Sequence, residues 1–167
     1  SRNQKFSFEK IFNIRQTVDN AWDFCPIEGA CEHMSSSKTG GLIVLAKTSE
    51  LRAFSETGQL INAKISAPLL EALFHHGSPL HDGATILVHN QIKAARCILP
   101  LTENPDIPAH LGMRHRAAVG MSESSDSFVI VISEETGEIS YANQSEFVQK
   151  VMPDQLKKAL KSAFKEN

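Results

Sequence analysis

Apolar positions recur at helical spacing near both ends of the chain. Between residues 8 and 18 they predict an amphipathic helix, and Ala21 and Trp22 continue its face. From Pro153 onward they predict a last helix with one apolar face, made of Leu156, Leu160, Ala163 and Phe164. Three further helices are predicted over 27–38, 68–74 and 114–121. Pro26 marks the start of the first of these, and Ser66 is the expected N-cap of the second.

Short apolar runs between these helices predict strands. Residues 42–46 are wholly apolar, as expected for a strand that is covered on both faces, and 128–132 is the most strand-like run in the chain. Residues 84–88 predict another strand, which His89 and Asn90 join to 92–99 as a hairpin. A turn at 135–138 leads into a strand at 139–141, and a short strand is expected at 51–54.

This order of elements predicts an α/β fold, with a mixed central sheet flanked by helices on both faces. The length of 167 residues and the 41% hydrophobic content suit one compact domain. Within it, residues 1–38 are expected to form a helical segment packed on a main domain at 39–167. The net charge of −2 argues against a general nucleic-acid-binding surface, and no apolar run approaches the roughly 18–20 residues of a membrane span.

The three cysteines cannot all be paired, which favours a reducing compartment and a cytoplasmic domain. Cys97 falls in an apolar strand and is expected in the core. Cys25, Cys31 and His33 could belong to a metal site, but their spacing matches no zinc pattern and a ligand is missing. Packing of the thiols within the helix is the favoured interpretation.

Two motifs carry candidate chemistry for a metal-bound polyphosphate. Asp82 can hold a divalent cation or draw a proton from a hydroxyl, and Gly83 lets the backbone approach a ligand closely. Arg114 and Arg116 suit phosphate oxygens through their planar donor groups. Each motif also has an ordinary explanation, because Asp-Gly is common in turns and Arg-His-Arg often lies on a solvated surface.

Together the two motifs resemble those of the diadenylate cyclase domain family, which condenses two ATP molecules into cyclic di-AMP. The signatures Asp-Gly-Ala and Arg-His-Arg stand here at 82–84 and 114–116. Residues 40–44 resemble the opening strand of the family, 99–105 its mid-domain loop and 133–140 its late hairpin. The matches follow one another from Gly40 to Ala142, so the resemblance covers most of the chain and implies the diadenylate cyclase fold.

The resemblance also implies roles for particular residues. Those expected to be catalytic are Asp82, Gly83, Arg114 and His115. Those expected to bind ATP are Gly83, Ala84, Leu99, Pro100, Arg114, His115, Arg116, Ser133, Glu134 and Glu135. Those expected to hold a divalent metal, Mg²⁺ or Mn²⁺, are His81, Asp82 and Glu135.

Several of these residues also have structural explanations. His81 could instead shape its loop through a hydrogen bond, and Ser133 and Glu135 could simply form a turn. Adjacent helical residues point about 100° apart, so Arg116 could pair with a carboxylate such as Glu134 rather than face the ligand. The chain also departs from the family at Met113, which replaces a threonine, and at Ile98, where some relatives have an aromatic residue.

The implied reaction needs two nucleotide sites that face each other, and therefore a homodimer in the active state. No DNA partner is expected. Some members of the family carry transmembrane helices ahead of the catalytic domain, and the start at Ser1 leaves room for such an anchor before it. The main alternative is a non-catalytic sensor of ATP or cyclic di-AMP, against which Asp82 argues. A structural interaction domain with coincidental motifs is a third interpretation.

Overall fold

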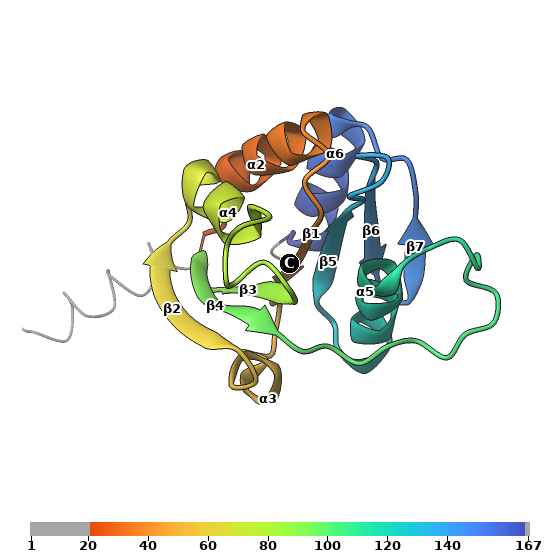
Figure 1. Ribbon diagram of the computed structural model, residues 1–167. Coiled ribbons are helices and arrows are strands. Elements are labelled where there is room, and N and C mark those ends of the chain that lie inside the picture. The colour runs from red at the N-terminus through yellow and green to blue at the C-terminus, as the bar shows by residue number, and fades with distance from the viewer. Residues whose placement is uncertain (1–20, 166–167) are drawn as a thin grey trace, which may run out of the picture.

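The computed structural model describes residues 21–165 of the chain. Within this range seven strands form one sheet in the order β2-β4-β3-β1-β5-β6-β7 (Figure 1). Strands β1 and β3 are parallel, and all the other neighbouring pairs are antiparallel. The strands are β1 (Gly41–Leu45), β2 (Gln59–Lys64), β3 (Ala84–Val88), β4 (Gln91–Cys97), β5 (Phe128–Ile132), β6 (Ile139–Asn143) and β7 (Glu146–Val148). The predicted mixed sheet is confirmed.

Helices cover both faces of this sheet. One face is covered by α2 (Cys25–Ser36), α4 (Ala67–Phe74) and α6 (Pro153–Ala163), and the other by α5 (Met113–Ser124) together with the short α3 (Arg52–Ser55) (Figure 1). Successive residues of a strand point to opposite faces, so Ile43 and Leu45 of β1 enter the first core, and Leu42 and Val44 enter the second. The sheet is therefore buried between two apolar layers, as its wholly apolar strands predict.

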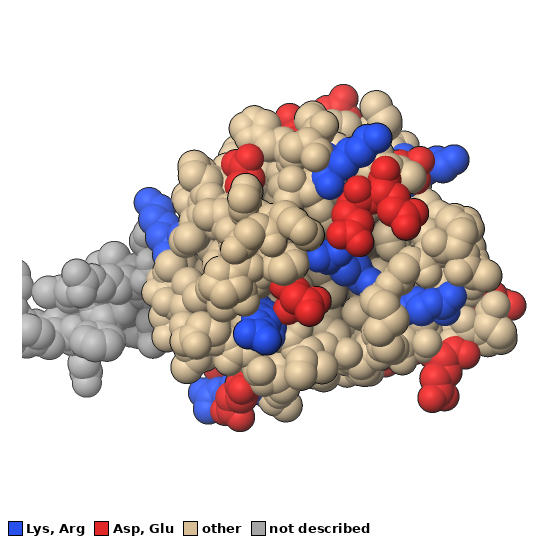
Figure 2. All heavy atoms as spheres, viewed as in Figure 1, with Lys and Arg blue, Asp and Glu red and all other residues tan. Residues whose placement is uncertain are grey.

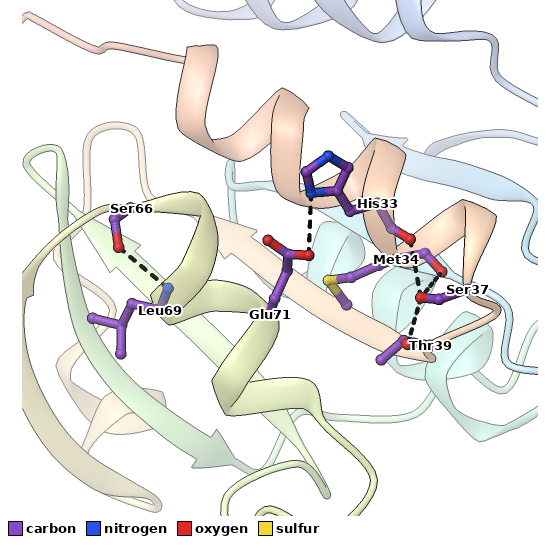
Figure 3. A network of polar contacts seen from close by, with 7 residues as sticks. All are labelled: His33, Met34, Ser37, Thr39, Ser66, Leu69 and Glu71. Carbon is purple, nitrogen blue, oxygen red and sulfur yellow. Dashed lines mark hydrogen bonds and ion pairs between the residues drawn. The ribbon is translucent and has the colours of Figure 1, made fainter.

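Local signals account for the ends of several helices. Ser66 caps α4, because its Oγ accepts a hydrogen bond from the backbone N–H of Leu69 at 3.2 Å. A second polar contact joins this helix to its neighbour: His33 Nδ1 on α2 lies 3.2 Å from Glu71 Oε1 on α4 (Figure 3). The predicted cap of α4 at Ser66 and the predicted start of α6 at Pro153 are both confirmed.

The structure corrects the prediction in other places. Residues 51–54 are not a strand: Leu51 adopts a left-handed conformation with a φ of 56° and starts the helical turn of α3. Strands β2 and β7 had not been predicted, and α2 begins two residues before the predicted start at 27. The helix predicted over 8–18 lies outside the described residues.

All three cysteines are free thiols in the structure. Cys97 is buried in the core, as predicted, and Cys31 is buried inside α2. Burial raises the pKa of the Cys31 thiol to about 12, and the carboxylates of Glu28 and Glu32 add to the effect. Such a thiol stays protonated, and no group of three or more metal-binding side chains occurs in the described part of the chain. Packing is therefore the role of Cys31.

Among the described residues, no helix is long and apolar enough to cross a membrane.

Candidate functional site

Two neighbouring depressions lie between β3, β4 and the start of α5. The first, called here the apolar cleft, has a volume of about 630 Å³ and is lined mainly by apolar side chains, among them Leu42, Leu80, Ile98, Leu99, Leu101 and Met113. The second, called here the polar hollow, has a volume of about 280 Å³ and is lined by His110, His115, Ser133, Glu134, Glu135 and Thr136, among others. Asp82, Met113 and Arg114 line both. Figure 2 shows acidic and basic side chains gathered around a depression in the middle of the face drawn.

The turn that leads into β3 places Asp82 where the two depressions meet. Gly83, the next residue, has a φ of 123°, a conformation that residues with a Cβ rarely adopt. A Cβ on Gly83 would also lie 2.8 Å from the carbonyl oxygen of Cys97 on β4. The Asp-Gly pair thus forms a tight turn packed against β4, and this turn holds the Asp82 carboxylate exposed at the junction. The turn interpretation and the functional one are both compatible with this geometry.

Helix α5 contributes Arg114 and His115 from its first turn. Its N-cap is Gly112, which makes no side-chain capping hydrogen bond, so the first backbone N–H groups of the helix are free of a side-chain acceptor. Such a helix start attracts anions through its N–H groups and its dipole. Arg114 and His115 both line the polar hollow beside it. Two of the groups predicted to bind phosphate, Arg114 and His115, are therefore brought together at one helix end.

The Arg114 side chain lies directly over Gly40, the residue before β1. A Cβ on Gly40 would stand 2.8 Å from Arg114 Nη1 and 3.1 Å from its Cζ. The Nη1 group donates a hydrogen bond to Glu134 Oε2 at 3.3 Å, whereas the buried Nε has no partner among the described residues. Because Gly40 has no side chain, the guanidinium of Arg114 can lie close to the backbone there. The sequence offered Gly40 only as part of a strand-like motif, without this role.

His115 is 8% exposed and lies edge-on to Phe147, with ring centroids 6.3 Å apart. Burial lowers its pKa below the ordinary value of 6.5, and the positive charges of His110 and Arg114 lower it further against the opposing effect of Glu138 and Glu135. His115 is therefore neutral at pH 7. A neutral imidazole can donate one hydrogen bond to a phosphate oxygen without bringing a second full charge.

The turn between β5 and β6 forms the acidic wall of the polar hollow. Ser133 Oγ accepts hydrogen bonds from the backbone N–H groups of Glu135 and Thr136, both at 3.2 Å. Ser133 therefore shapes the turn as well as lining the hollow. Glu134 and Glu135 are exposed there, and Glu134 pairs with Arg114 rather than with Arg116 as the sequence had suggested. The hypothesis of an Arg116–Glu134 pair is wrong.

Four of the predicted site residues line neither depression. His81 Nδ1 is hydrogen-bonded to the carbonyl oxygen of Ser78 at 2.6 Å, which favours its loop-shaping interpretation. Ala84 is fully buried in the core. Pro100 packs its carbonyl against Gly120 of α5, where a Cβ would come within 2.1 Å of it. The remaining residue is Arg116, one turn into the helix, whose carbonyl accepts a hydrogen bond from Thr102 N–H at 3.0 Å.

The structure adds cleft residues that the sequence had not assigned to the site, although Ile98 and Met113 had been noted as departures from the family. Arg96 on β4 lines the apolar cleft, and so do the residues 57–59 that connect α3 to β2. Three apolar residues at the cleft are unusually exposed: Ile98 is 70% exposed, Met113 65% and Leu101 46%. Met113 is the first residue of α5, whereas Ile98 and Leu101 lie in the segment that follows β4. Their exposure marks a surface that an apolar ligand or a partner could cover.

These features suit a ligand with a flat apolar part and a polyanionic part. The apolar cleft can take an aromatic ring, and the polar hollow offers a guanidinium, an imidazole and a helix start to phosphates. Asp82 and Glu135 provide carboxylate oxygens beside them, but within residues 21–165 no group of three or more metal-binding side chains gathers to hold a metal alone. Mg²⁺ commonly binds through one or two carboxylates plus substrate phosphates, so these two residues fit a metal that binds with the nucleotide.

The chain is similar to known proteins in both sequence and fold. The model of the family described as DisA bacterial checkpoint controller nucleotide-binding, DAC, matches residues 28–147. A crystal structure of a double mutant of DacA from Staphylococcus aureus superimposes with a TM-score of 0.82 at 34% sequence identity, covering 92% of this chain and 99% of that chain. The fold and both motif-bearing segments fall within the matched residues.

Two relatives similar in sequence are named as enzymes that make cyclic di-AMP. Diadenylate cyclase CdaS of Bacillus thuringiensis is 48% identical over 116 residues, which are 70% of this chain and 58% of that protein. Cyclic di-AMP synthase CdaA of Bacillus subtilis is 43% identical over 141 residues, which are 84% of this chain and 52% of that protein. The chain thus spans little more than half the length of these two relatives.

Proposed function

This chain belongs to the diadenylate cyclase family, whose domain is described as the DisA-type nucleotide-binding domain, and on that basis we propose that it condenses two ATP into cyclic di-AMP and two pyrophosphates. The observation that carries the proposal is the position of Asp82. Its carboxylate stands at the junction of a cleft suited to adenine and a hollow suited to phosphates, which is where the ribose of a bound ATP would lie.

The proposed reaction has two equivalent steps. In each, the 3′-hydroxyl oxygen of one ATP attacks the α-phosphorus of the other, the new O–P bond forms, and the bond from that phosphorus to the bridging oxygen of pyrophosphate breaks. The hydroxyl proton leaves toward a base, and Asp82 is the carboxylate placed to accept it or to hold the hydroxyl for attack. Positioning and stabilisation of charge supply most of the rate in such phosphoryl chemistry.

The remaining residues bind and orient the nucleotide. Arg114 and the neutral His115 hold phosphate oxygens at the start of α5, and Ser133 lies at the far wall of the same hollow. Leu99 offers an apolar wall to the base in the cleft. Gly83 admits the ribose by lacking a side chain. We keep Asp82 and Glu135 as the groups that hold Mg²⁺ or Mn²⁺ together with the phosphates, where the ion would spread their negative charge. His81 is left out of this set.

Two copies of the chain must meet for the reaction, because each ATP supplies the hydroxyl that attacks the other. We propose a face-to-face homodimer in which the two clefts oppose each other across a two-fold axis. The exposed Ile98, Leu101 and Met113 support this arrangement, since an apolar surface beside a site is suited to being covered on assembly. Asp82 of one copy would then act beside the phosphates bound by the same and the opposing copy.

Incubation with ATP and either Mg²⁺ or Mn²⁺, followed by chromatography of the nucleotides, tests the proposal. Cyclic di-AMP and pyrophosphate should appear in a ratio of one to two, and a chelator should abolish both. Formation of ADP alone, or of no product with either metal, would contradict it. Tight binding of ATP or cyclic di-AMP without turnover would instead identify the chain as a sensor.

A further inference from the structure

Arg96 occupies an irregular position in β4, directly beside the Asp82–Gly83 turn. Ala84 of β3 pairs with Cys97 of β4, and Ile86 of β3 pairs with Ala94 of β4. Between these two pairs β3 has one residue and β4 has two, so β4 carries a bulge there. Arg96 lies in this bulge with a φ of 54°, in the left-handed region. Glycine and asparagine are the usual occupants of that region, so an arginine there stores local strain. Strain of this kind concentrates at functional sites.

Two glycines hold the bulge from either side. A Cβ on Gly83 would lie 2.9 Å from the carbonyl carbon of Arg96, and a Cβ on Gly58 would lie 2.2 Å from the carbonyl oxygen of Ala95. Thr57 Oγ1 also accepts a hydrogen bond from the backbone N–H of Ile98 at 2.9 Å. The bulge is thus packed in place by its neighbours. The direction in which Arg96 leaves β4, into the apolar cleft, follows from this packing.

The charge of Arg96 is uncompensated inside the cleft. Among residues 21–165, no carboxylate oxygen lies within 4.0 Å of its guanidinium, although Asp82 lines the same cleft. Arg114, the other cation that lines the cleft, is already paired with Glu134. An exposed guanidinium without an internal partner beside the proposed reaction centre is suited to an anion brought by the ligand.

We propose that Arg96 is a second phosphate-binding residue of the site: it lines the apolar cleft and not the polar hollow, and it would reach the polyphosphate of ATP at the junction, where Arg114 lines both depressions. The proposal rests on the proposed function in taking ATP as the ligand. It assigns to the bulge a purpose: the displaced segment of β4 brings a second cation to the edge of the Asp82–Gly83 turn, beside Arg114. Negative charge that develops on the leaving pyrophosphate would then lie between two guanidinium groups.

Calorimetry with two ligands separates this role from a structural one. The ligands are 3′-deoxy-ATP, which lacks the attacking hydroxyl and cannot turn over, and 3′-deoxyadenosine, which lacks the phosphates. Arg96→Gly should weaken binding of 3′-deoxy-ATP by about tenfold or more, the size expected for a lost charge-assisted hydrogen bond, and leave 3′-deoxyadenosine unchanged. Arg96→Lys should recover part of the affinity, because it keeps the charge.

Lys150 provides a matched control. It is also an exposed cation with a φ of 54°, and it lines neither the apolar cleft nor the polar hollow. Glycine relieves the left-handed backbone at both positions, so neither Arg96→Gly nor Lys150→Gly should lower the melting temperature, and only the former should weaken 3′-deoxy-ATP binding. Unchanged affinity of Arg96→Gly for 3′-deoxy-ATP, or equal losses for both ligands, would overturn the proposal.

The binding experiment is independent of turnover. If the unaltered chain makes cyclic di-AMP but Arg96→Gly binds 3′-deoxy-ATP normally, the role of Arg96 is wrong and the proposed function stands. If Arg96→Gly loses affinity for 3′-deoxy-ATP alone while the unaltered chain makes no product, Arg96 is a phosphate-binding residue of a sensor.

Discussion

Asp82 is exposed, lies in a tight turn and makes no hydrogen bond or ion pair that holds the fold together within residues 21–165. The conformation of the turn depends instead on Gly83, whose φ of 123° and contact with β4 exclude a larger residue. The two halves of the motif therefore have separable tasks. Gly83 gives the turn its shape, and Asp82 is free to act on a ligand.

We expect Asp82→Asn to fold normally and to lose turnover by at least ~10²-fold, the scale of a positioned acid–base group. The amide keeps the size of the side chain and removes its charge and its basicity. Thermal denaturation should give a melting temperature close to that of the unaltered chain, and product chromatography should report the rate. Near-normal turnover would show that Asp82 serves the turn alone.

His115 links the site to the pH dependence of stability. Its pKa is lowered in the folded chain, chiefly by burial, so below the ordinary value of 6.5 the unfolded chain takes up a proton that the folded chain resists. The stability that the neutral His115 contributes is therefore present above pH 6.5 and is lost as the pH falls below it. The difference in melting temperature between the unaltered chain and His115→Gln should shrink from pH 8 to pH 5. Parallel curves for the unaltered chain and for His115→Gln would mean that His115 is not the group that titrates.

At the scale of elements, helix α5 and the loop from Leu99 to Thr102 form one packed unit. Gly120 of α5 faces the carbonyl oxygen of Pro100, where a Cβ would approach to 2.1 Å, and Thr102 Oγ1 donates a hydrogen bond to Glu123 Oε1 at 2.6 Å. This contact positions Leu99 in the wall of the apolar cleft. The absence of a side chain at Gly120 thus permits the close packing that positions Leu99.

We expect Gly120→Ala to destabilise the chain by about 1–3 kcal/mol, because a methyl group is forced into a filled space. The melting temperature should fall by several degrees and cyclic di-AMP formation should drop with it. Gly29 in α2 is the control: a Cβ there would meet only Ala67 Cβ at 3.9 Å, so Gly29→Ala should raise the melting temperature through better helix propensity. A rise at both positions would mean that the loop moves aside freely.

The sequence predicts elements best where one physical signal decides them. The strands β3 and β5 lie where their apolar runs place them, and Ser66 marks the start of α4 as a side-chain cap should. Strand β2 was missed because it is largely exposed at the edge of the sheet, so its pattern carries little hydrophobic signal. The 51–54 segment was misassigned because its helical turn depends on Leu51 in a left-handed conformation.

The candidate site follows the same division. Its motifs could be found in the sequence because together they resemble those of the diadenylate cyclase family, and the structure brings Asp82, Arg114 and His115 around one hollow. Arg96 could not be found, because its position depends on a bulge that only the pairing of β3 with β4 reveals. The error over Arg116 has a similar origin, since which of two nearby arginines reaches Glu134 depends on how α5 lies over Gly40.

At the scale of the whole molecule, residues 21–165 of one copy offer one apolar cleft and one polar hollow around Asp82. A cyclic product needs two hydroxyls and two α-phosphates, so a single copy can hold only half of the reacting groups. Mixing Asp82→Asn with Arg114→Ala should therefore not restore full turnover, because both bond-forming steps use the paired sites. Full recovery in the mixture would argue that one complete site is enough.

The dependence of rate on concentration tests the same geometry in the unaltered chain. If two copies must meet, the rate of cyclic di-AMP formation per chain should rise with protein concentration until the dimer saturates. Replacing the exposed Ile98 and Leu101 by polar residues should shift this rise to higher concentration by weakening the apolar contact, and calorimetry should show how much ATP binding each replacement retains. Light scattering on the same samples reports the fraction of dimer. A rate per chain that stays constant down to concentrations where scattering detects only monomer would rule out the face-to-face mechanism, and with it the proposed condensation of two ATP.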